Sequence, residues 1–194
     1  MKRLLILFLC LCMLSVCAVA EAPQEVPNGY RLEDFGDFTM AIAPNAFVRH
    51  YGKDAEDGVV AQVIYLDFSC EHFAPYIVIW WHPNNMSNYL RGVHPLDYAK
   101  SLRDNVTSGW REAGMTITAP NAVYGQKRGD VLTCMISCRI EENSWFSDDA
   151  HDLWMVQRFF GTYDMGTYYF EIYAESREDA DALIKDIDRV VYKK

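Results

Sequence analysis

A short, asparagine-rich segment holds the side chains best suited to bind a polar ligand. It lies between residues 82 and 94 and follows an apolar run, Tyr76 to Trp81, with the composition of a buried strand. Imidazole and amide groups can hydrogen-bond a ligand while an indole stacks on it, and loops that leave core strands are common binding positions. We therefore predict a ligand-binding site made of Trp81, His82, Asn84, Asn85 and His94.

The same histidines support a second interpretation, in which the protein is a hydrolase or a metal-dependent enzyme. Such an enzyme would use His82, His94 or an acidic loop further along the chain. That loop contains Glu141, Glu142, Asp148, Asp149, His151 and Asp152, but it lacks the ligand spacing of an EF-hand. A solvated acidic loop is the simpler interpretation.

No recognised catalytic motif supports the enzyme interpretation. The sequence contains no G-x-S-x-G, no H-E-x-x-H, no Walker loop and no dinucleotide fingerprint. Cys70 and His72 could form a nucleophile and its base, but no third group is placed to orient them. We therefore predict no catalytic residues, no metal ligands and no cofactor.

Three cysteines follow residue 20. Cys134 and Cys138 share one face of a predicted strand and lie about 13 Å apart at roughly 3.3 Å per residue. A disulfide needs Cα atoms within about 7 Å, so these two cannot bridge each other. Either of them could pair with Cys70, and the apolar face that they share equally fits two unpaired core residues.

The first twenty residues have the pattern of a signal peptide. Lys2 and Arg3 precede an apolar run, and Ala18-Val19-Ala20 forms an A-x-A cleavage site. We therefore expect a secreted or periplasmic protein with a signal peptide over 1–20, a flexible lead-in over 21–29 and a single domain over 30–194. The alternative, disfavoured because Val16 precedes the cysteine, is a lipid anchor at Cys17.

The charge of the chain limits its partners. The formal net charge is −9 at pH 7, which disfavours binding to nucleic acid and to anionic lipid. After residue 20 no apolar segment approaches the length of a transmembrane helix. The expected partner is therefore an unidentified protein or small molecule at the cell envelope.

Hydrophobic periodicity predicts a sheet of short strands with two amphipathic helices. In the predicted strand over 59–68, one face should hold Val60, Ile64, Leu66 and Phe68, and the run over 75–81 fits a strand covered on both faces. The expected strands are 38–43, 45–51, 59–68, 75–81, 115–124, 131–140, 153–160 and 168–174, and the expected helices are 95–113 and 176–192. Short connections make the sheet mainly antiparallel, so we predict an α+β fold, a three-layer α/β/α sandwich with two long helices.

This layout resembles the PsbP-like superfamily, which includes bacterial envelope proteins of the DcrB type. The resemblance covers most of residues 30 to 192. It rests on a helix from Pro95 to Ala113 after a polar loop, on an aromatic strand pair around Gly161-Thr162-Tyr163, and on a closing helix from Ser176. It implies a non-enzymatic, exported envelope protein that binds a partner protein or a small ligand. It carries over no individual site residue.

Overall fold

The computed structural model describes residues 26–53, 56, 58–66, 70–84, 86, 91–128, 131–141, 149–159 and 166–193. The predicted signal peptide and Cys17 lie outside these residues, as do most of the lead-in and Asn85.

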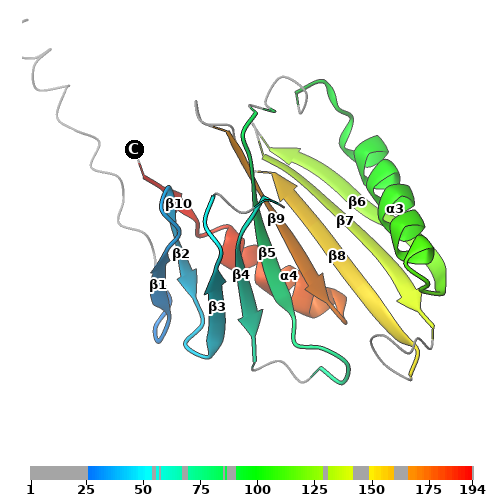
Figure 1. Cartoon of the computed structure of the whole chain (residues 1–194), viewed down its shortest axis with the longest axis horizontal. Coiled ribbons are helices and arrows are strands. Elements are labelled where there is room, and N and C mark those ends of the chain that lie inside the picture. The colour runs from blue at the N-terminus through cyan, green and yellow to red at the C-terminus, as the bar shows by residue number, and fades with distance from the viewer. Residues whose placement is uncertain are drawn as a thin grey trace, which may run out of the picture.

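Two antiparallel sheets form the framework of the described residues (Figure 1). The larger sheet has seven strands in the order β3-β4-β5-β9-β8-β7-β6, and the smaller has three in the order β1-β2-β10. The strands are β1 Arg31–Asp34, β2 Phe38–Ile42, β3 Ala46–His50, β4 Val59–Tyr65, β5 Tyr76–His82, β6 Ile117–Arg128, β7 Val131–Ile140, β8 His151–Phe159, β9 Thr167–Ala174 and β10 Val191–Tyr192. The helices are α3 Pro95–Glu112 and α4 Arg177–Ile187.

One face of the large sheet is buried beneath α4 and the small sheet. Phe38 of β2 packs edge-on against Phe170 of β9 with ring centroids 5.6 Å apart. Leu183 and Ile187 of α4 belong to the same buried cluster. Ser176 caps this helix by accepting a hydrogen bond from the Asp179 amide, as its sequence position predicts.

The opposite face is covered by α3, which lies over the β6–β7 end of the sheet (Figure 1). Ala99 and Leu102 of α3 pack against Cys134 and Ile136 of β7. The helix begins very close to β6, because a Cβ atom at Gly125 would lie 2.0 Å from the Pro95 carbonyl oxygen. Only glycine allows this approach.

The α+β class and the mainly antiparallel sheet are confirmed, but the three-layer α/β/α sandwich with two long helices is not. The second helix is not long: it ends at Ile187, because Val191 and Tyr192 leave the helix and pair with Thr39 and Phe38 of β2. Helical cover on the α3 face is limited to one end of the sheet, so the three-layer arrangement is not confirmed as predicted. Among the described residues, no helix is long and apolar enough to span a membrane.

Two predictions about individual strands are wrong for identifiable reasons. In β4 the register shifts between Val59 and Ala61, so Val60 is buried as its predicted face implies, but beyond it the buried residues are Ala61, Val63 and Tyr65, and Leu66 is 62% exposed. Phe68 lies outside the described residues. In β5 only Ile77 and Ile79 are buried, and the strand is not covered on both faces because α3 does not extend over it.

Candidate functional site

The predicted loop site begins at the end of β5, where its polar groups bond to one another. The Asn84 amide donates to His82 Nδ1 at 3.1 Å. Thr167 of β9 donates to the Asn84 carbonyl and accepts from the Met86 amide, both at 3.0 Å. The loop is therefore held to β9 by its own backbone, which leaves fewer groups for a ligand.

The other predicted members lie in different surroundings. Trp81 packs against the core beneath α4, and the Lys53 ammonium lies 5.3 Å from its ring centroid. The His94 side chain is 70% exposed at the start of α3, with Nδ1 3.6 Å from Asp97 Oδ2. Within the described part of the chain, no contact joins His94 to Trp81, His82 or Asn84. The ligand-binding role of this set stays a prediction.

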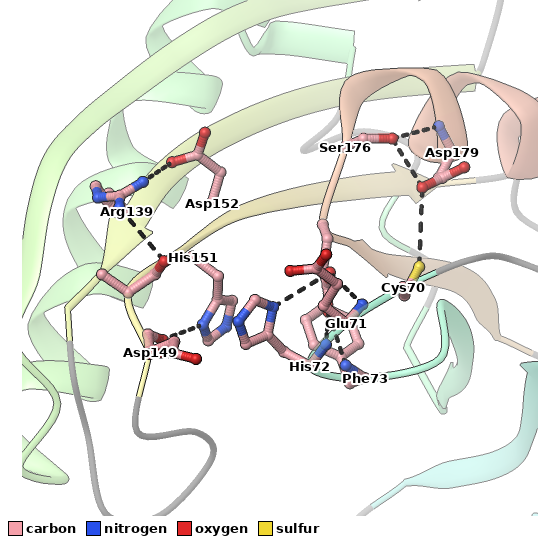
Figure 2. A network of polar contacts seen from close by, with 12 residues as sticks. Cys70, Glu71, His72, Phe73, Arg139, Asp149, His151, Asp152, Ser176 and Asp179 are labelled. Atoms are coloured by element: carbon pink, nitrogen blue, oxygen red, sulfur yellow. Dashed lines mark hydrogen bonds and ion pairs between the residues drawn. The ribbon is translucent and has the colours of Figure 1, made fainter.

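The three cysteines are free thiols in the structure. Cys134 and Cys138 are buried on the α3 face, and Cys70 Sγ lies 3.9 Å from Asp179 Oδ2 at the start of α4 (Figure 2). No disulfide joins Cys70 to Cys134 or to Cys138 in the structure, and the pairing that the sequence leaves open stays a prediction. Burial, followed by the charge of Glu175, raises the pKa of Cys70 to about 11, so this thiol is not an activated nucleophile.

The structure instead brings together two histidines that the sequence separates by 79 positions, His72 and His151. Their rings stack with centroids 4.3 Å apart and an interplanar angle of 15° (Figure 2). His72 comes from the segment before β5, and His151 is the first residue of β8. Because the His72 ring faces His151 and the Cys70 sulfur faces Asp179, the two do not form a nucleophile and base.

A single carboxylate holds the His72 segment in place. Glu175 follows β9 directly and accepts hydrogen bonds from three consecutive backbone amides, those of Glu71, His72 and Phe73, at 3.1, 2.7 and 2.7 Å. Its Oε2 atom also lies 3.3 Å from His72 Nδ1. Burial acts to raise the pKa of Glu175, but the hydrogen bonds from Phe73, His72 and Glu71 together outweigh it and hold the pKa below its usual value.

Next to the histidine pair the structure contains an apolar pocket of about 190 Å³. It lies between the C-terminal end of α3 and the sheet. Its walls are formed by Phe73, Tyr76, Trp110, Met115, Ile140, His151, Leu153 and Tyr173. A cavity of about 150 Å³ is large enough for benzene, so this pocket has room for one aromatic or branched aliphatic group.

His151 is the polar edge of the pocket. The residue is 6% exposed, and its Nδ1 atom lies 3.2 Å from the Asp149 carbonyl oxygen. A carbonyl only accepts, so we assign the proton of a neutral imidazole to Nδ1, which makes Nε2 an acceptor.

A buried hydrogen-bond network fixes the wall that contains Tyr173. Glu171 of β9 is 8% exposed and accepts from Trp80 Nε1 at 2.9 Å, Gln157 Nε2 at 3.0 Å and the Tyr173 hydroxyl at 3.1 Å. Tyr98 of α3 extends the network by donating to Gln157 Oε1 at 2.7 Å. Burial raises the pKa of Glu171. With both oxygens bonded, the carboxylate can hold Tyr173 in one orientation.

Sequence reasoning missed this site because its walls come from five separate segments. One signal was available: Glu171 is the only charged residue in the aromatic and apolar strand Thr167–Ala174. A lone carboxylate in such a strand indicates a buried, hydrogen-bonded group. Among the described residues, no group of three or more histidine, cysteine, aspartate or glutamate side chains is arranged to hold a metal ion.

Comparison with known proteins gives a fold and no more. No protein-family model and no curated protein matches the chain. Among solved structures it is similar to the solution structure of cyanobacterial PsbP (CyanoP) from Synechocystis sp. PCC 6803. The TM-score is 0.52 and the identity 11%, over 90% of this chain and 99% of that chain. Such low identity supports conclusions about fold alone, and on that ground the chain has a PsbP-like fold.

Proposed function

We propose that this chain is an exported, non-enzymatic binding protein of the bacterial cell envelope, and that its pocket beside Trp110 and His151 receives an apolar side chain of a partner protein. The observation that carries the proposal is the pocket itself, whose walls are mainly apolar, whose Tyr173 wall is held by the Glu171 network and whose edge carries one imidazole. The signal-peptide pattern supports export, and the resemblance to proteins of the DcrB type supports an envelope location.

The size of the pocket favours a protein partner over a free small ligand. Burying one side chain of benzene size stabilises a complex by about 1.5–3 kcal/mol. That is about one to two powers of ten in Kd, which is too little for tight binding of a free ligand. It is the usual contribution of a single anchor residue within a larger interface.

The chemistry of the site argues against the enzyme interpretation. Among the described residues, neither His72 nor His151 hydrogen-bonds a serine, threonine or cysteine side chain, so neither histidine is paired with a hydroxyl or thiol nucleophile. The thiols of Cys70, close to His72 in sequence, and of Cys138, packed in the same cluster as the pocket walls, both have pKa values raised by burial. Binding of an apolar side chain requires only a pocket of suitable shape and polarity, and this pocket has both.

The proposal is tested by photo-crosslinking in the envelope of the producing cells. A photoreactive amino acid replaces Met115, which lines the pocket, in the full chain, and the matched control carries it at Leu66, which is 62% exposed. We expect a discrete cross-linked partner from position 115 that disappears when Leu153→Trp fills the pocket. No cross-link from position 115, or an equal one from position 66, would contradict the proposal. Export is tested in the same preparation by intact mass spectrometry. Cleavage of the signal peptide predicts the mass of a chain whose first residue is Glu21.

A further inference from the structure

A second pocket, of opposite chemical character, opens on the α4 face of the sheet. It has a volume of about 240 Å³ and lies between strands β6, β7 and β8 and the C-terminal end of α4. Its walls include Tyr124, Gln126, Arg128, Thr133, Arg158 and Asp188. We call it the arginine pocket.

Strand register places the polar groups of the arginine pocket side by side. Gln126 of β6 pairs with Thr133 of β7, and Thr133 pairs with Arg158 of β8. The three side chains therefore form one row across three neighbouring strands. Arg128 lies two residues beyond Gln126 and so projects from the same face of β6. The row brings two guanidinium groups, a hydroxyl and an amide to one cavity.

The ion pair already present in the arginine pocket is asymmetric. The Arg158 side chain is 14% exposed, whereas its partner Asp188 is 51% exposed. A half-exposed carboxylate loses little by turning to solvent, because exposed ion pairs contribute about 0–1 kcal/mol. A largely buried guanidinium gains more from an anion that meets its flat edge with two parallel hydrogen bonds.

We propose that the arginine pocket binds a compact oxyanion, a carboxylate or a phosphate, which replaces Asp188 as the partner of Arg158. Arg128 supplies the second positive charge, and the hydroxyl groups of Thr133 and Tyr124 are the neutral donors of the cavity wall. Among the described residues that line the pocket, two arginines against one aspartate give a net charge of +1. This local charge is opposite to the net charge of −9 of the whole chain.

The volume of the arginine pocket and its electrostatics set the expected affinity. A cavity of about 150 Å³ holds benzene, so 240 Å³ admits phosphate or acetate together with water. Asp188 is the C-cap of α4, and the negative end of the helix dipole therefore lies near Arg158. Because this end opposes a bound anion, we expect a Kd in the millimolar range.

The test is a pair of NMR titrations of the whole protein, one with inorganic phosphate and one with acetate, at an ionic strength held constant with sodium chloride. Four proteins are compared: the natural chain, Arg158→Gln, Asp188→Asn and Arg139→Gln. Arg139 is the matched control, since it also pairs with an aspartate, Asp152 at 3.2 Å, but lies near the far end of β7 and is 44% exposed.

We expect saturable chemical-shift changes at the amides around Thr133 and Arg158 with one or both anions. The anion that binds shows whether the pocket takes a phosphate or a carboxylate. Arg158→Gln should weaken binding at least about tenfold, whereas Asp188→Asn should tighten it severalfold because the competing carboxylate is gone. Arg139→Gln should leave it unchanged. The absence of saturable shifts with either anion, or equal weakening by the two arginine variants, would overturn the proposal. If Arg158→Gln does not fold, Thr133→Val, which replaces the hydroxyl by a methyl group, should still weaken binding.

Discussion

Phe170 and Glu171 are neighbours in β9, yet their side chains meet opposite surroundings. Phe170 is fully buried on the α4 face among aromatic and aliphatic side chains. Glu171 is buried on the α3 face, where it binds an indole, an amide and a phenol. One strand thus supplies an apolar core on one side and a polar, specific network on the other. The difference indicates that the α4 face mainly stabilises the fold, and that the α3 face holds the pocket in shape.

The largest effect should come from truncating the α4 face. Phe170→Ala removes a fully buried aromatic ring and leaves a cavity, so we expect a loss of about 3–5 kcal/mol in the free energy of unfolding. Urea denaturation followed by circular dichroism measures it. Phe47→Ala, at a ring that is 51% exposed, is the control and should cost far less. Equal losses of stability at the two positions would contradict the conclusion that the α4 face mainly stabilises the fold.

A smaller loss of stability, joined to a loss of binding, is expected on the α3 face. Glu171→Ala leaves the Trp80, Gln157 and Tyr173 donors without their acceptor. Because only Gln157 among these three residues is buried, we expect a total cost of about 1–3 kcal/mol. The variant should also lose the cross-link at position 115, because the Tyr173 wall is no longer fixed. The exposed Glu112→Ala should change neither quantity. A folded Glu171→Ala protein with an unchanged cross-link would show that the network does not support the pocket.

The smallest effect is a pH dependence, and it distinguishes Glu171 from Glu175. The pKa of Glu175 is held below its usual value of 4.5, so its contribution to stability is complete above that pH and is lost as the pH falls through the lower folded-state pKa. Glu175→Gln should therefore flatten the loss of stability below about pH 4.5. Glu171 has a raised pKa, so it should act in the opposite direction, with stability falling as the pH rises above 4.5.

Thermal unfolding between pH 3 and pH 6, in roughly half-unit steps, measures these slopes. Glu178→Gln, an exposed change of the same charge at the start of α4, is the control. Parallel curves for Glu175→Gln and the natural chain would rule out the hydrogen-bonded carboxylate as a source of the acid sensitivity.

Elements with a strong local pattern could be predicted from the sequence. The strand Val131–Ile140 has the predicted bounds, because its alternating side chains and flanking turn agree with its position inside the sheet. The first helix begins at Pro95 as predicted, because proline is tolerated best in the first turn of a helix.

What failed depended on contacts between distant segments. Val190 and Val191 continue the apolar stripe of α4, but pairing with β2 takes Val191 out of the helix. The asparagine-rich loop was predicted as a ligand site from its composition. In the structure the Met86 amide of this loop donates a hydrogen bond to Thr167, which lies 81 residues further along the chain. The histidine pair and the pocket are joined only by the folded sheet, so no local pattern points to them.

The most direct test of the account is whether the pocket beside Trp110 and His151 takes up an apolar group. Toluene, the probe, is titrated into the purified protein and into Leu153→Trp, with Leu66→Trp as control, and backbone amide shifts are followed by NMR. We expect saturable shifts around Met115, Ile140 and Tyr173 in the natural chain and in Leu66→Trp, and none in Leu153→Trp. Shifts that do not saturate, or that persist when Leu153→Trp fills the pocket, would contradict it.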